Sequence, residues 1–431
     1  MDYNNTKTIE QNYSCILPYE ISEEQWNLSE SFAWWLDGFS SVVIGFVGII
    51  LNVTSIVVLW GSDLAASFFN WLLVCLAMFD ILFLLSGILE AFRGHILAES
   101  TALYNQLFVH FLFPFRSIVM CCSIYMTVIL ALERYNAFKR PLSSRKNSVR
   151  QQNLKSYFFS NWRRVMKYVG PIVVFSTLFY IPKWFELQLT QQKNVSNINV
   201  VESNDSMKEI IVELTELRKN NQYSLWYLNV ANPLITALFP LMALAYLNIN
   251  IYCEFKRYLR RQPSFAGLTM AAGIADRHVQ RRIRKREREL VQQTTVLFAI
   301  VVLFVLFHVL RIILNIEELD SLYRVRHARE IGCEWLQFWT LIAVPISNSL
   351  LQINSSINFF IYCVFNKSFR DTLKSKLPWL FRDPINMDNT TSQKMCKTEM
   401  NEANQMHNGN HKNEDNSVIA EMNGKKTQTD V

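Results

Sequence analysis

The sequence predicts an all-α membrane protein, a seven-transmembrane helix bundle followed by a short amphipathic eighth helix. Half of the 431 residues (50%) are hydrophobic, and they gather in long apolar runs unlike the shorter amphipathic segments of a soluble domain. Basic residues concentrate in two loops, whereas acids dominate the amino-terminal segment. This segregation indicates a fixed orientation in a membrane more than a nucleic-acid surface.

Seven apolar runs can each cross ~30 Å of hydrocarbon, which takes roughly 20 helical residues. In chain order they are 39–60, 71–92, 107–134, 165–185, 226–252, 291–316 and 336–364. The bases that follow the third and fifth runs place those loops in the cytoplasm and the amino terminus outside the cell. After the last run, residues 366–377 alternate basic and apolar side chains, as expected of a short helix at the membrane interface.

Three regions follow from this pattern. Residues 1–37 form an extracellular tail, residues 38–380 the membrane domain with its interfacial helix, and residues 381–431 a disordered cytoplasmic tail without apolar periodicity. N-x-Ser/Thr sequons lie outside the predicted spans at Asn4, Asn12, Asn27, Asn194 and Asn204. Each is a candidate glycosylation site, although such sequons also arise by chance in an Asn-rich chain.

The third run ends in charged residues. Its apolar stretch reaches Leu132 and meets Glu133-Arg134-Tyr135. A charge at the bilayer centre costs several kcal/mol, so we expect this triplet at the helix end, near water. A local surface ion pair between Glu133 and Arg134, worth ~1 kcal/mol or less, is the simplest interpretation.

Polar residues also lie inside the runs, where lipid offers no hydrogen-bonding partner. The most demanding is Asp80 in the second run, because an unpaired carboxylate there would be costly. A Na⁺ ion, or a proton, together with nearby polar groups would offset that cost. The candidate groups are Asn52, Ser123, Asn354 and Asn358. The alternative, that these groups only join helices, explains the amides well and Asp80 poorly. Apart from this sodium site, neither a metal nor a cofactor is predicted.

These motifs together resemble those of rhodopsin-like (class A) G-protein-coupled receptors. The matching residues, in order and each on the expected helix, are Asn52, Asp80, Glu133-Arg134-Tyr135, Pro240 and Asn358-Phe359-Phe360-Ile361-Tyr362. Residues 181–186, 246–248 and 308–315 look like the invertebrate FMRFamide-type neuropeptide receptors. The resemblance implies a multi-pass receptor of the plasma membrane, not an enzyme. It would bind an extracellular neuropeptide, an amidated FMRFamide-like peptide, and signal through a heterotrimeric G protein.

The resemblance also implies two groups of site residues. Activation would use Glu133, Arg134, Tyr135, Asn358 and Tyr362, with Arg134 paired to Glu133 when closed and freed for the G protein when open. A peptide ending in Arg-Phe-amide would need a carboxylate and aromatic walls among the outer halves of the helices. The candidates there are Glu90, Arg116, Trp184, Glu186, His308, Arg311 and Glu318. For any one of them, structural pairing of Arg116 or Arg311 with a Glu is an equally good explanation.

The chain departs from the receptor pattern at several positions. The usual Asn-Pro-x-x-Tyr is Asn358-Phe359-x-x-Tyr362, and the sixth run has no proline and has His308 where a tryptophan is usual. No cysteine lies near Val109 or in the loop 183–224, so the customary disulfide cannot form. Cys15 and Cys333 are a potential substitute in an oxidising compartment, and the sequence leaves open whether they pair.

Other functions stay open. A secondary transporter would show repeats between its halves, and none is visible. A receptor for a small amine would want an acid near Arg116, and the seventh run has no lysine for a retinal Schiff base. The terminal Thr429-Asp430-Val431 resembles ligands of PDZ domains, a three-residue match that chance also produces. The expected partners are therefore a peptide, a G protein, membrane lipids and a PDZ protein, without nucleic acid.

Overall fold

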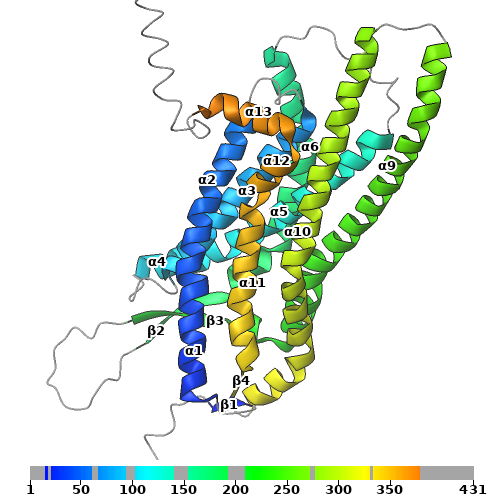
Figure 1. Cartoon of the computed structure of the whole chain (residues 1–431). Coiled ribbons are helices and arrows are strands. Elements are labelled where there is room, and N and C mark those ends of the chain that lie inside the picture. The colour runs from blue at the N-terminus through cyan, green and yellow to red at the C-terminus, as the bar shows by residue number, and fades with distance from the viewer. Residues whose placement is uncertain are drawn as a thin grey trace, which may run out of the picture. The chain divides into compact units, whose positions relative to one another are not determined.

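The computed structural model describes residues 15–17, 21–60, 67–93, 102–139, 154–192, 209–271, 277–330 and 333–378. Figure 1 shows that helices dominate. Within these ranges, six helices are long and apolar enough to cross a membrane: Glu23–Leu59, Phe68–Ala91, Ala102–Ala137, Asn161–Phe185, Asn221–Glu254 and Thr294–Ser321. The prediction of a mostly helical, multi-span membrane protein is confirmed at this level.

The first membrane helix begins well before its apolar run. α1 (Glu23–Ala33) continues through a π-helical stretch, Trp34–Ser40, into α2 (Ser41–Leu59). A capping box starts it, because Ser22 Oγ accepts from the backbone N–H of Gln25 and Gln25 Oε1 accepts from that of Ser22, both at 3.2 Å. The hydropathy of the sequence locates the part of a helix that lies in lipid, whereas the capping residues determine where the helix begins.

The next spans follow the predicted order. They are α3 (Phe68–Ala91), α5 (Phe113–Lys139), α6 (Leu154–Phe179) and α9 (Phe239–Ala271). α5 is preceded by α4 (Ala102–Leu107) and π-helical Phe108–Leu112; α9 is preceded by α7 (Glu216–Lys219), α8 (Asn221–Tyr223) and π-helical Ser224–Ala231 and Leu234–Leu238. α10 (Arg277–Glu330) is one helix of 54 residues, as a stretch without proline permits.

The predicted seventh run is divided. α11 (Phe338–Ser356) and α12 (Asn358–Phe365) meet at Ile357, and the many polar side chains of α11 lower its hydropathy. α13 (Lys367–Lys376) follows where the sequence predicts the amphipathic helix. The seventh crossing and the interfacial position of α13 stay predictions.

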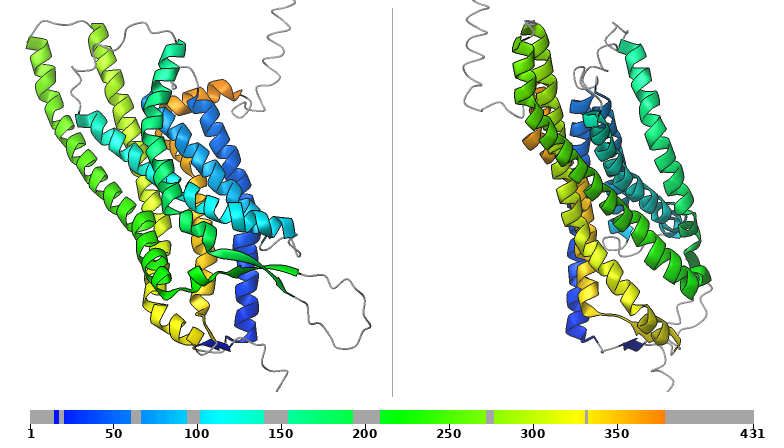
Figure 2. Two further views of the ribbon diagram at one scale, coloured as in Figure 1. Left: turned by 180° about the vertical axis from the view of Figure 1, so that it is seen from behind. Right: turned by 90° about the vertical axis from the view of Figure 1, so that its right-hand side faces the viewer.

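α3 and α5 lie at the centre of the helix packing. α3 contacts α2, α5, α6 and α11, and α5 contacts α3, α6, α9 and α10. Figure 2 shows α4 and α5, in cyan, crossing the bundle obliquely. Most side chains of α3 are buried, so polar groups on this helix must find partners within the protein.

Two small sheets accompany the helices. β2 (Leu187–Gln192) and β3 (Glu209–Leu214) form an antiparallel hairpin that begins with Leu187 opposite Leu214. β1 (Cys15–Leu17) and β4 (Cys333–Trp335) form a parallel ladder that joins the amino-terminal segment to the connection between α10 and α11.

Gly48 allows α2 and α11 to approach closely. A Cβ atom at this position would lie 2.1 Å from Ser356 Oγ and 2.8 Å from Leu84 Cδ1. Small residues serve this purpose between membrane helices, where close backbone approach replaces the hydrophobic effect as the source of packing energy.

We expect Gly48→Ala to destabilise the protein by ~1–3 kcal/mol, because the added methyl group has no space. The thermal unfolding midpoint of the purified full-length protein in detergent measures the loss. Gly170→Ala is the matched control, since a Cβ at Gly170 meets nothing within 4 Å. Equal midpoints for the two variants would contradict the close contact of α2 and α11.

Candidate functional site

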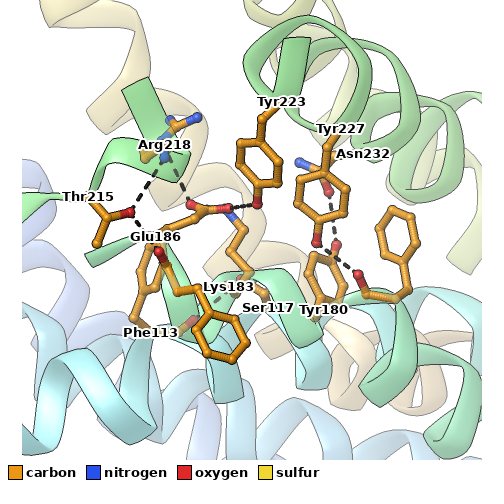
Figure 3. Close-up of polar contacts among 12 residues, drawn as sticks. Phe113, Ser117, Tyr180, Lys183, Glu186, Thr215, Arg218, Tyr223, Tyr227 and Asn232 are labelled. Carbon is orange, nitrogen blue, oxygen red and sulfur yellow. Dashed lines mark hydrogen bonds and ion pairs between the residues drawn. The ribbon is translucent and has the colours of Figure 1, made fainter. Parts of the chain in front are cut away.

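A buried carboxylate organises the base of the β2–β3 hairpin. Glu186 is 0% exposed and lies just after the 3₁₀ turn Ile181–Phe185. Its Oε2 is 3.0 Å from Lys183 Nζ and 3.7 Å from Arg218 Nε, and its Oε1 accepts from the Tyr223 hydroxyl at 2.8 Å (Figure 3). Three partners from three segments therefore saturate this acid.

The same region is closed by further hydrogen bonds. Thr215 Oγ1 donates to the carbonyl of Phe185 at 2.6 Å, and Tyr180 donates to Asn232 Oδ1 at 3.0 Å (Figure 3). The indole Nε1 of Trp184 donates to the carbonyl of His110 at 3.0 Å. The connection between α6 and β2 is thus fastened to the π-helical segment Phe108–Leu112 before α5 and to the helical segment before α9.

The remaining predicted ligand residues lie on α3, α5 and α10. Glu90 and Arg116 form an ion pair, and the Arg116 guanidinium also lies 5.4 Å from the centroid of Phe83. His308 is 5% exposed and stacks on Phe304 with ring centroids 3.8 Å apart. Its Nδ1 is 2.8 Å from the carbonyl oxygen of Phe304. These three ionisable side chains, Glu90, Arg116 and His308, are therefore already engaged.

Arg311 and Glu318 are different. The half-buried Arg311 interacts electrostatically with Arg116, Lys183 and His308, so the predicted residues share one electrostatic neighbourhood. Among the described residues, however, neither Arg311 nor the exposed Glu318 side chain forms an ion pair with another side chain. Glu318 is also the acid that attracts Arg311 electrostatically, at a separation beyond a direct ion pair.

Asp80 binds two other helices in the centre of the bundle. It is 1% exposed; Ser123 Oγ on α5 donates to Oδ1 at 2.7 Å, and Asn358 Nδ2 on α12 donates to Oδ2 at 2.8 Å. No cationic side chain pairs with Asp80 in the described part of the chain. A buried carboxylate beside a hydroxyl oxygen fits either a sodium ion or a proton as the missing positive charge.

Two predicted members of this centre are placed elsewhere. Asn52 Nδ2 donates at 2.9 Å to the carbonyls of Gly48 and Ser355, so it joins α2 to α11. No hydrogen bond joins Asn354 to Asp80 within the described ranges. The seam between the first helix and α11 is extended by Gln352, which donates to Ser41 Oγ at 2.9 Å.

At the other end of α5, Arg134 packs against an aromatic ring. Its guanidinium carbon lies 3.8 Å from the centroid of Phe69 on α3, and the side chain is nearly buried. The distance to Glu133 Oε1 is 3.8 Å, long for a hydrogen-bonded ion pair. Tyr135 beside it is half-buried. Phe69 could not be predicted from the sequence, because ring stacking between helices has no local signal.

Other predicted positions are only partly covered. Asn27 is exposed on α1. Asn4, Asn12, Asn194 and Asn204, the PDZ-type residues Thr429 and Val431, and the proposed cytoplasmic tail lie outside the described residues. Glycosylation and PDZ binding stay predictions.

Comparison with known proteins decides the family. Residues 39–379 match the model of the serpentine type 7TM GPCR chemoreceptor Srw family. The chain belongs to this family. It is also 26% identical over 349 residues to the FMRFamide receptor of Drosophila melanogaster, covering 78% of this chain and 52% of that protein. The chain thus spans about half the length of the curated relative it matches. These similarities indicate a receptor and not an enzyme.

We expect Glu186→Gln to lower stability by ~1–3 kcal/mol, because Lys183 and Arg218 lose their shared anion in a buried setting. Thermal unfolding measures this, and Glu216→Gln is the control, since its ion pair with Lys219 is at the surface. Unchanged stability with a large loss of agonist potency would instead assign Glu186 to ligand contact.

Proposed function

We propose that this family member is a plasma-membrane receptor with an extracellular amino terminus and a seventh crossing formed by α11 and α12. Its ligand is an extracellular amidated FMRFamide-like neuropeptide, and it signals through a heterotrimeric G protein. The observation that carries the ligand class is the 26% identity to an FMRFamide receptor. The rhodopsin-like motif series supports the coupling, with Arg134 and Asp80 both buried at helix contacts.

The outer neighbourhood of charges supports a peptide with a cationic side chain. Since Glu186 and Glu90 already have basic partners, we assign recognition of the peptide's arginine to Glu318. Arg311 then donates hydrogen bonds to the carbonyl oxygens near the amidated end, because a guanidinium is a fork of hydrogen-bond donors. In this proposal Glu186 holds the hairpin at the mouth of the site.

The inner end of α5 supports the switch. A guanidinium stacked on Phe69 at 3.8 Å gains about 0.5–2 kcal/mol, enough to bias an equilibrium between a closed and an open arrangement without locking it. Ligand binding would favour the arrangement in which Arg134 leaves Phe69 and reaches the G protein. The sodium ion or proton at Asp80 belongs to the closed arrangement, and Thr429 and Val431 are proposed to bind a PDZ protein in the tail.

A panel of peptides tests the ligand class. We expect amidated Arg-Phe peptides to activate a G-protein reporter in cells that express the receptor. The same peptides as free acids, or with arginine replaced by uncharged citrulline, should be at least tenfold less potent, because a charge-assisted hydrogen bond contributes ~1.5–3 kcal/mol. Substrate uptake without G-protein activation would point to a transporter, and activation by amines alone to another ligand class.

Removal of the ring under Arg134 should raise signalling without ligand. We expect Phe69→Leu to increase basal G-protein activation about 2- to 30-fold. This is the change in the equilibrium to which a stacking energy of about 0.5–2 kcal/mol corresponds. Phe68→Leu is the control, since Phe68 lies against Tyr168 and Arg164 instead. Adding Arg134→Ala to Phe69→Leu should abolish the signal at equal surface expression; persistent signalling in that double variant would refute the switch.

A further inference from the structure

Cys15 and Cys333 are register partners. β1 and β4 run in parallel, with Cys15 opposite Cys333, Ile16 opposite Glu334 and Leu17 opposite Trp335. Figure 1 shows the two strands side by side where α10 ends and α11 begins. Two cysteines far apart in the sequence are thus placed at the same position of one ladder.

The spacing of a sheet suits a covalent bond between them. Neighbouring strands lie about 4.7–4.9 Å apart, and a disulfide spans Cα atoms about 4.4–6.8 Å apart. The typical spacing of register partners therefore lies within the range of Cα distances that a disulfide spans. We propose that Cys15 and Cys333 form a disulfide bond that ties the amino-terminal segment to the α10–α11 connection.

The ladder needs such a bond to persist. Two paired strands of three residues each are too short to be stable by themselves in water. β4 is held on its own side, because the guanidinium of Arg324 lies 5.2 Å from the centroid of Trp335 and 2.5 Å from Asp320 on α10. β1 precedes α1 by a short segment, and a covalent link to β4 would anchor it in the same way.

The other cysteines of the described chain are not competitors. Cys75, Cys121 and Cys122 are free and buried among the helices, and Cys253 and Cys363 are free toward the proposed cytoplasmic ends. The customary partners near Val109 and in the loop 183–224 do not exist in this sequence. A disulfide between Cys15 and Cys333 therefore anchors the outer loops at a different place from the customary disulfide.

Formation of the bond is an oxidation. The two thiols lose two protons and two electrons, and the electrons reduce the disulfide of a secretory-pathway thiol oxidoreductase to two thiols through a mixed disulfide. The proposal rests on the extracellular amino terminus of the proposed function, since the cytosol would keep both thiols reduced.

A cleavable tail tests the bond in the full-length receptor. An epitope tag is placed at the amino terminus, and a protease site is inserted after Leu17, between β1 and α1. Intact cells are labelled with an antibody to the tag and then treated with protease. We expect the tag to stay on the receptor after cleavage and to leave only when a reductant is added.

The variants make the result specific. Cys15→Ser and Cys333→Ser should each release the tag without reductant, and Cys253→Ser should behave as the parent. Should a variant fail to reach the surface, peptide mapping of the parent receptor after thiol alkylation gives the same answer. A linked peptide pair, lighter by two hydrogens and separated by reduction, is then expected.

Three results would overturn the bond. They are release of the tag from the parent without reductant, alkylation of both cysteines, and a disulfide-linked dimer on a non-reducing gel. Failure of the antibody to label intact cells is a separate outcome. It would place the amino terminus inside the cell and overturn the proposed orientation together with the bond, whereas the first three leave that orientation intact.

Discussion

A carboxylate inside a bilayer must find its partners within the protein, and Asp80 sets this requirement for the whole bundle. Because its two oxygens are bound by Ser123 and Asn358, α3 is tied at one point to α5 and α12. α3 is also the helix with most of its side chains buried. Apolar packing between helices gains little over contact with lipid, so this polar centre contributes to holding α3 beside α5 and α12.

The two ends of the molecule are held by different kinds of contact. At the hairpin, Glu186 has three charged or hydroxyl partners and no exposure, and breaking such a cluster leaves a buried charge unpaired at a cost of several kcal/mol. At the other end, Arg134 rests on a ring and on a distant carboxylate. A guanidinium that leaves a ring for water or a protein partner loses little. Exchanging the Phe69 contact alone therefore costs less than breaking the Glu186 cluster.

The sequence predicted the features that depend on amino-acid composition, such as the membrane helices. It did not predict the features that depend on three-dimensional geometry, such as helix ends and contacts between distant segments. Apolar runs located the membrane helices because hydrocarbon thickness sets their length, and the contact of Asp80 with Ser123 and Asn358 followed from lipid offering no alternative partner. Helix ends were missed, since the cap at Ser22 and the length of α10 lie outside the apolar runs. The contacts of Glu186 with Arg218 and Tyr223 could not be predicted from the sequence. The pairing of β2 with β3 brings these residues close to one another.

α10 and the Asn358-Phe359-x-x-Tyr362 motif contain no proline. The helix is interrupted at Ile357, directly before the amide that binds Asp80. Four residues later the hydroxyl of Tyr362 is buried, and within the described ranges it has no hydrogen-bond partner, which costs ~1–3 kcal/mol. A second arrangement of α12 that satisfies Tyr362 would recover this energy and break the Asn358–Asp80 bond. In the proposed switch, opening the inner end and changing the charge at Asp80 would then be one event, coupled through the interruption between α11 and α12.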